Sequence, residues 1–234
     1  MRTLGFSTGA LAYGNFHRAL EMLRPYDTHA VELSALRQPE LGPLTAASND
    51  LDLSQYRYVA VHAPSNVDVE AERQVVNYLL DLARHGWSIV VHPDAIHDYG
   101  AWREFGNLLC VENMDKRKPI GRTVEELASV FEELPDASLC LDLGHARQVD
   151  ATMTEAYLIA KVYESKLRQV HVSEVNTSSR HDRLSFSSIR AFQLVAELIP
   201  EDVPLIIESV IEGWEIPDEL RRVEEALPTT VMLV

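Results

Sequence analysis

Residues 109–145, LCVENMDKRKPIGRTVEELASVFEELPDASLCLDLGH, decide the fold because they contain one complete strand–helix–strand unit. The apolar runs at 108–112 and 139–143 are typical of two buried strands. Between them, residues 124–133 show the spacing of a helix, and Thr123-x-x-Glu126 supplies a capping-box signal for its start. Strand, helix and strand in this order form the repeating unit of α/β proteins.

Similar apolar or β-branched runs recur along the whole chain, and most gaps between them have a helical pattern, clearest at 69–84. Eight such repeats in 234 residues predict an α/β fold, a single (β/α)8 TIM barrel that takes up residues 1–234 as one domain. An open, doubly wound sheet is the alternative, because alternation alone does not prove closure. The predicted strands are residues 3–7, 30–33, 58–62, 89–92, 108–112, 139–143, 169–172 and 205–208.

Two segments depart from this rhythm. In residues 36–55, Pro39, Gly42 and Pro43 interrupt any helix and predict an irregular connection. Residues 229–234 are apolar, and we expect this tail to pack under the barrel.

Composition and charge exclude several classes of protein. With 46% hydrophobic and 24% charged residues, the chain is typical of a globular protein. It has no signal-peptide pattern and no apolar run of about 18–20 residues, so we expect a cytoplasmic protein with no membrane partner. The net charge of −15 opposes an extended nucleic-acid partner. Cys110 and Cys140 lie in apolar runs and are predicted to be buried free thiols.

Seven of the predicted strands end in a residue that can bind a metal. Charged residues are rarely buried without a partner. Seven acidic or histidine side chains at one rim would therefore need a charge partner, and a bound cation is the simplest partner. The carboxyl ends of the strands are also where barrels carry their active sites. The seven residues are Glu32, His62, His92, Glu112, Asp142, His171 and Glu208.

Further donors follow shortly after these strands, namely His145, Glu174 and His181. A ligand set of imidazole and carboxylate groups suits zinc, manganese, iron or magnesium. It does not indicate a thiolate site. We leave Glu32 out of the predicted ligands, because a glutamate at a strand end can instead accept hydrogen bonds from loop amides. The remaining histidines, on predicted helices or at strand starts, are interpreted as structural: His17, His29, His85 and His97.

Basic residues follow the fifth, sixth and seventh strands and would gather on the same face of an acidic protein. Either they are solvated loop charges, or they bind an anionic small molecule such as a phosphorylated sugar. These residues are Lys116, Arg117, Lys118, Arg122, Arg147, Arg180 and Arg183.

From Val31-Glu32-Leu33 through Ile207-Glu208-Ser209, the chain resembles the xylose isomerase-like TIM-barrel superfamily, which includes endonuclease IV and the sugar phosphate isomerases/epimerases. The resemblance implies a shared metal centre formed by Glu112, Asp142, His171 and Glu208. It also implies, for epimerase-type members, that Glu112 and Glu208 act as the catalytic acid/base pair. Residues 171–176, HVSEVN, resemble an epimerase motif, but Thr177 stands where an arginine is usual.

Endonuclease IV carries two further metals, and the resemblance implies that extra ligands are present here too. A second metal would then be bridged by Glu112. A third is incomplete, because Ser179 replaces an aspartate of that enzyme, unless Asp182 substitutes for it. The implied extra ligands are His62, His92, His145 and His181, in VHA, VHP, GH and RH.

Three functions follow. The sequence favours, by a narrow margin, a divalent-metal-dependent sugar or sugar-phosphate isomerase/epimerase. The alternatives are an endonuclease IV-like multi-metal phosphoesterase and a barrel that binds metal or ligand without turnover. We expect one to three zinc or manganese ions per chain and a small anionic sugar-type substrate. Its predicted contacts are Glu174, Arg147, Arg180, Arg183 and Lys116.

Overall fold

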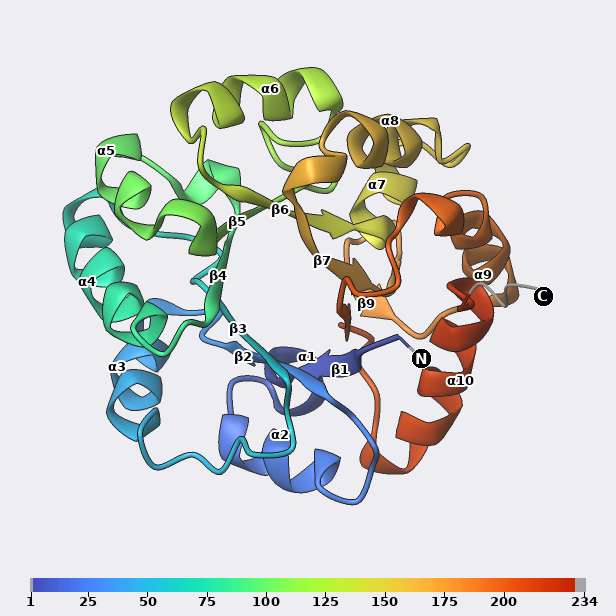
Figure 1. The fold of residues 1–234 in the computed structure, drawn as a ribbon, viewed down its shortest axis with the longest axis horizontal. Coiled ribbons are helices and arrows are strands. Elements are labelled where there is room, and N and C mark those ends of the chain that lie inside the picture. The colour runs from blue at the N-terminus through green and yellow to red at the C-terminus, as the bar shows by residue number, and fades with distance from the viewer. Residues whose placement is uncertain (1, 230–234) are drawn as a thin grey trace.

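The computed structural model describes residues 2–229 and shows a closed barrel of eight parallel strands surrounded by helices (Figure 1). The strand order is β1-β10-β7-β6-β5-β4-β3-β2, and β1 pairs with both β10 and β2 to close the barrel. The predicted (β/α)8 barrel is therefore confirmed, and an open sheet is excluded. The strands are β1 Leu4–Ser7, β2 Ala30–Ser34, β3 Tyr58–His62, β4 Ser88–Val91, β5 Leu109–Glu112, β6 Ser138–Asp142, β7 Leu167–Val172 and β10 Leu205–Ile207.

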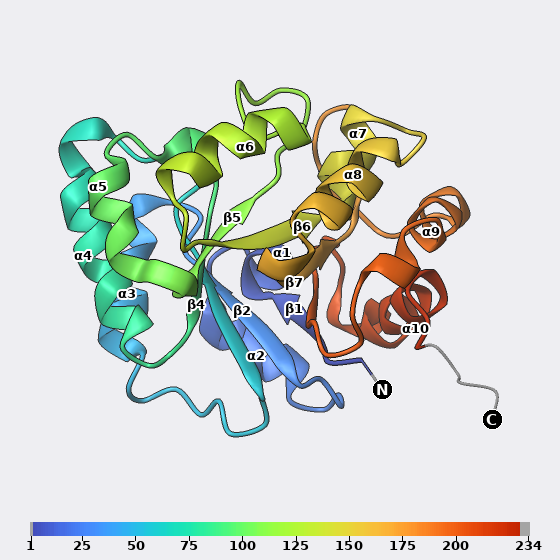
Figure 2. The ribbon, with the colours of Figure 1, turned by 45° about the horizontal axis from the view of Figure 1, so that its top comes forward.

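Most of the helices surround the outside of the barrel (Figure 2), whereas the short helices that directly follow β1 and β6 contribute residues to its carboxyl end. The helix predicted at 124–133 is present with those bounds, and the side chain of Thr123 accepts a hydrogen bond from the Glu126 amide at its start. The helices are α1 Thr8–Ala12, α2 Phe16–Leu23, α3 Gln38–Ala47, α4 Glu72–Ala83, α5 Tyr99–Trp102, α6 Val124–Glu133, α7 Leu143–Val149, α8 Thr154–Val162, α9 Phe186–Gln193 and α10 Ile216–Ala226. Within residues 2–229, none of them is long and apolar enough to cross a bilayer.

The prediction of an irregular connection at 36–55 is wrong for its first half, where α3 forms. Pro39 lies in the first turn, where a backbone N–H has no partner within the helix in any case. Pro43 removes one hydrogen bond inside the helix, but Leu41 and Leu44 are completely buried against the barrel. This packing holds the helix together despite the two prolines.

Apolar packing occurs in two places. A large core fills the space between the strands and the helices, whereas a small cluster lies inside the barrel and consists of Ala60, Val90, Cys110 and Cys140. Both cysteines are free and buried, as predicted. The small interior side chains leave room at the carboxyl ends of the strands for the polar groups described next. The predicted packing of the 229–234 tail concerns residues that, apart from Thr229, lie outside those described.

Candidate metal centre

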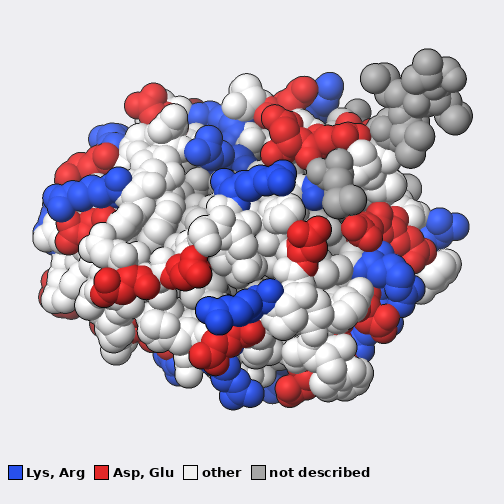
Figure 3. Space-filling model, turned by 60° about the horizontal axis from the view of Figure 1, so that its bottom comes forward, with Lys and Arg blue, Asp and Glu red and all other residues white. Residues whose placement is uncertain are grey.

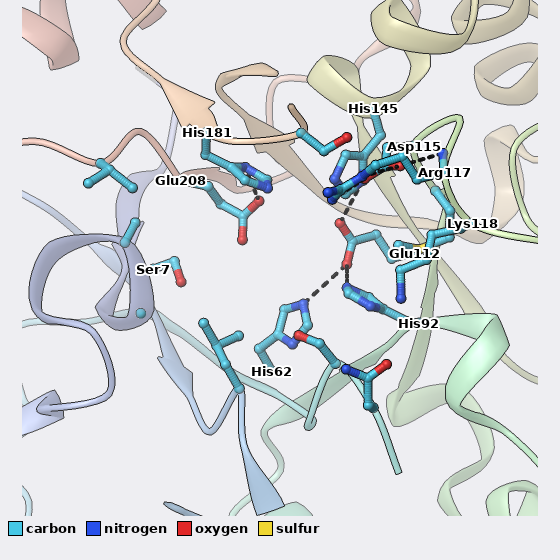
Figure 4. A pocket seen from close by; sticks show the side chains of 18 of the residues that line it. Ser7, His62, His92, Glu112, Asp115, Arg117, Lys118, His145, His181 and Glu208 are labelled. Carbon is cyan, nitrogen blue, oxygen red and sulfur yellow. Dashed lines mark hydrogen bonds and ion pairs between the residues drawn. The ribbon is translucent and has the colours of Figure 1, made fainter. Parts of the chain in front are cut away.

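A cavity of about 390 Å³ opens at the carboxyl ends of the strands, where the barrel brings the predicted strand-end ligands together. Figure 4 shows the four that line the cavity, His62, His92, Glu112 and Glu208. The six donors come from six different strands or the residues that follow them. None has more than 9% of its surface exposed, so each is a buried polar group that needs a partner. They are His62, His92, Glu112, Asp142, His171 and Glu208.

Glu112, the last residue of β5, lies at the centre of this group. Its Oε2 atom is 3.2 Å from Nε2 of His62 and 3.3 Å from Nε2 of His92. Its Oε1 atom is 3.2 Å from Nδ1 of His171 and 3.3 Å from Nδ1 of His145. The two oxygens of one carboxylate therefore face two separate pairs of imidazoles.

Two other carboxylates carry oxygens that have no hydrogen-bond partner although they are buried. Oδ2 of Asp142 accepts no hydrogen bond and lies 3.4 Å from Nδ1 of His145. Oε2 of Glu208 accepts none either and lies 3.4 Å from Nδ1 of His171. A buried acceptor without a partner costs about 1–3 kcal/mol. A bound cation would satisfy both oxygens, so the residues present fit a metal.

The donor atoms are also close enough to share ions. Three groups each offer ligand atoms that all lie within 4.8 Å of one another. Glu112 belongs to two of them, and the carboxylate and imidazole donors match the ligands preferred by zinc and manganese. The groups are His62–His92–Glu112, Glu112–Asp142–His171–Glu208, and Glu32–His62–Glu208.

Burial and mutual charge shift the pKa values of these groups strongly. Burial raises the pKa of Glu208 to about 8, and burial lowers the pKa of His181 to about 3, with the charge of His145 adding to the effect. Burial also opposes a proton on His62, but the surrounding carboxylates, led by the hydrogen-bonded Glu112, outweigh it and raise the pKa of His62 to about 9. Protonated imidazoles thus offset carboxylate charge in the chain alone, and a divalent cation would take over this role.

The residues after β5 and β6 fix the backbone of the site. The side chain of Asn113, directly after Glu112, exchanges two hydrogen bonds with the backbone of Asp142. The side chain of Asp142 in turn accepts a hydrogen bond from the His145 amide at the start of α7. Gly144 allows this helix to approach closely, because a Cβ atom there would lie 2.5 Å from the carbonyl oxygen of Ser173.

A small antiparallel sheet that the sequence did not predict positions His181. It consists of β8 Glu174–Val175 and β9 His181–Asp182. Nδ1 of His181 hydrogen-bonds Ser173 Oγ and lies 3.3 Å from Glu208, and its ring centre is 5.3 Å from that of His145. Asp182 is exposed and bonds to Asn176, because neighbouring strand residues face opposite ways. The structure therefore brings His145 and His181 together, without Asp182.

The predicted substrate contacts lie elsewhere on the described part of the chain. Arg147 pairs with Glu174, and Arg183 pairs with Glu215, so these charges hold loops together. The cavity is instead lined by Arg117 and Lys118, which pair with Asp115 and Asp94. Within residues 2–229, the cavity lining does not include Lys116, Arg147, Glu174, Arg180 or Arg183.

No protein-family model matches the chain, and no curated protein sequence does either. Solved structures match it in fold. Endonuclease IV from Thermus thermophilus is 20% identical, with 96% of this chain and 100% of that chain covered and a TM-score of 0.60. A xylose isomerase domain protein from Alicyclobacillus acidocaldarius is 13% identical, with 96% and 98% covered and a TM-score of 0.62.

A xylose isomerase-like TIM barrel protein from Mycobacterium smegmatis, solved in complex with magnesium, is 12% identical, with 97% of each chain covered and a TM-score of 0.59. At these identities the likeness shows the fold. It agrees with the predicted TIM barrel as a fold.

Proposed function

We propose that the protein is a metal-dependent phosphoester hydrolase that acts on a small anionic phosphoester, such as a phosphorylated sugar. The observation that carries the proposal is the surroundings of Glu112, whose two oxygens face separate histidine pairs. A carboxylate placed in this way can bridge two cations. Two cations a few ångströms apart are the usual apparatus for displacement at phosphorus.

The proposed ligands divide around Glu112. Bound there, divalent cations would supply Lewis-acid stabilisation of charge on the phosphoryl oxygens. One cation would be held by His62, His92 and Glu112, and the other by Glu112, Asp142, His171 and Glu208. His145 and His181 lie beside the second position, near Glu112 and Glu208, as a partial third site.

The cavity and the surface charge favour a small substrate. A volume of about 390 Å³ suits a small molecule, and the cationic ends of Arg117 and Lys118 beside the histidines suit its phosphate. On the face shown in Figure 3, Lys and Arg are interspersed with Asp and Glu instead of gathered into one basic surface. Together with the net charge of −15, this favours a small phosphoester over an extended nucleic acid.

The second candidate is the sugar or sugar-phosphate isomerase/epimerase that the sequence favoured. It is supported by Glu112 and Glu208, which reach into the cavity from opposite sides (Figure 4), as an acid/base pair requires. The isomerase/epimerase reaction needs a single cation, and it needs on each of the two glutamates one carboxylate oxygen that is free to exchange a proton with the substrate. Both oxygens of Glu112 face histidines, which is why we place this function second.

Activity assays test the proposal. The protein is stripped with a chelator, reloaded with zinc or manganese, and assayed with p-nitrophenyl phosphate, its diester and a panel of sugar phosphates. We expect metal-dependent phosphate release that falls to background in Glu112→Gln. The matched control is Glu72→Gln, which changes a buried glutamate bonded to Trp102 outside the site.

The alternatives predict different products. Interconversion of sugar phosphates without release of phosphate would contradict hydrolysis and favour the isomerase/epimerase. Metal binding without turnover of any substrate would favour a barrel that only binds metal or ligand.

A further inference from the structure

Glu32, at the carboxyl end of β2, is a completely buried carboxylate beneath the candidate metal centre. We propose that it is a positioning residue, which holds His171 with its Nδ1 atom directed at the metal. This inference rests on the metal binding in the proposed function and adds to it a residue outside the predicted ligand set. Because β2 and β7 are not neighbours in the barrel, the contact crosses the barrel interior.

The contact involves the ring nitrogen of His171 that faces away from the ligands. Oε2 of Glu32 lies 2.9 Å from Nε2 of His171, and neither residue is exposed to solvent. An ionised carboxylate only accepts hydrogen bonds, so this contact places the imidazole N–H at Nε2. The other nitrogen, Nδ1, hydrogen-bonds Oε1 of Glu112 at 3.2 Å and lies 3.4 Å from Oε2 of Glu208. A cation bound there would replace the proton on Nδ1, because a ligating histidine is neutral.

A second buried hydrogen bond holds the carboxylate itself in place. Nε2 of Gln169, two residues before His171 in β7, donates to the same Oε2 atom of Glu32 at 2.8 Å. The hydroxyl of Tyr58 donates to Oε1 of Gln169 at 2.6 Å, which fixes the direction of the amide. Nε2 of Gln169 also lies 2.8 Å from Nε2 of His171, and Glu32 is the acceptor that both nitrogens share.

The same geometry raises a competing role for Glu32. Its Oε1 atom has no hydrogen-bond partner, and Glu32 forms a ligand-sized group with His62 and Glu208. Glu32 would then bind a cation directly. The two donors already held by Oε2 favour positioning, because a ligating glutamate would be free to turn towards the ion.

The two roles predict different losses on substitution. A carboxylate that orients a ligand histidine typically changes metal affinity about 10–100-fold when it is removed. Glutamine keeps an oxygen that accepts the hydrogen bond from His171, whereas alanine does not. If Glu32 positions His171, Glu32→Gln should weaken binding less than Glu32→Ala, with the number of bound ions unchanged. If Glu32 is a ligand, both variants should lose one ion.

The experiment is a zinc titration of the metal-free protein against a chromophoric chelator, for wild type, Glu32→Gln, Glu32→Ala and the control Glu72→Gln. Cobalt-substituted samples report the ligand geometry by absorption, and circular dichroism confirms folding. We expect Glu32→Ala to weaken one binding step about 10–100-fold, Glu32→Gln to weaken the same step less, and Glu72→Gln to bind as wild type.

Wild-type affinity in Glu32→Ala would overturn the proposal, and so would equal losses in both Glu32 variants or an equal loss in Glu72→Gln. If Glu32→Ala does not fold, the comparison of Glu32→Gln with Glu72→Gln decides, because only the former should weaken binding and change the cobalt spectrum. A wild-type protein that binds no metal would instead contradict the proposed function. The readout is metal binding, so failure to find a substrate does not affect it.

Discussion

The side chain of Asn113 is hydrogen-bonded to the backbone of Asp142 in both directions. Its Oδ1 atom accepts from the Asp142 amide at 2.7 Å, and its Nδ2 atom donates to the Asp142 carbonyl oxygen at 2.9 Å. Both residues are completely buried. This pair joins the end of β5 to the end of β6, and so fixes the spacing between Glu112 and Asp142.

Replacing Asn113 by alanine should therefore weaken both the fold and metal binding. Two backbone groups would be left buried without a partner, at a cost of about 1–3 kcal/mol each. Thermal unfolding and zinc affinity of Asn113→Ala check this. The control is Asn107→Ala, at an exposed position. Unchanged stability and affinity in Asn113→Ala would show that the spacing is fixed in some other way.

The relation between Asn113 and Asp142 also shows where sequence reasoning stops. The strand-end donors were predictable, because parallel strands in a barrel place all their carboxyl ends on one rim. The partner of Asn113 was not, since it depends on the distance between two strands and their register. Its only signal in the sequence is its position directly after Glu112.

Other features were missed for similar reasons. The contact between Glu32 and His171 joins residues 139 positions apart and crosses the barrel, so no local sequence pattern predicts it. The β8–β9 pair consists of two-residue strands, which are too short for a periodic signal. Helix α3 was missed because its prolines are visible in the local sequence, whereas the tertiary packing of Leu41 and Leu44 that stabilises the helix is not.

Gly144 should not tolerate a side chain. A Cβ atom there would lie 2.5 Å from the Ser173 carbonyl oxygen and 2.7 Å from Cγ2 of Val175, so α7 would have to move and carry His145 with it. We expect Gly144→Ala to lower the free energy of unfolding by about 1–3 kcal/mol or more.

Denaturant unfolding of Gly144→Ala beside Gly42→Ala measures this effect. Gly42 lies inside α3, where a Cβ atom meets nothing closer than 3.8 Å outside its chain neighbours. The helical preference of alanine is offset there by the following Pro43, so alanine should change the stability little. Equal stability of the two variants would be inconsistent with the close approach of α7.

Metal removal should destabilise the protein, because cations would bind the folded state and offset its buried carboxylates. At a free metal concentration about 100 times the Kd, binding contributes about 2.7 kcal/mol. This corresponds to a shift in Tm of about 5–10 °C for a chain of this length. Calorimetry with chelator and with added zinc or manganese measures the shift. A Tm that is the same in both conditions would argue against a metal site.

Basic residues that line the cavity should contribute more to substrate binding than a nearby lysine that does not line it. Lys118 lines the cavity, whereas Lys116 does not, although the sequence analysis named Lys116 as a substrate contact. A hydrogen bond to a charged group contributes about 1.5–3 kcal/mol, so Lys118→Ala should raise KM for a phosphoester about 10–100-fold. Lys116→Ala is the matched control, with KM close to wild type. A larger increase in KM for Lys116→Ala than for Lys118→Ala would instead support Lys116 as the substrate contact.

The central claim is that Glu112 joins two metal positions, and a count of metal ions per chain tests it most directly. Elemental analysis would compare the wild type with the double variant His62→Ala, His92→Ala, which removes the two histidines facing Oε2 of Glu112. We predict at least two equivalents in the wild type and one fewer in the variant. One equivalent in the wild type, unchanged in the variant, would contradict the two-metal account.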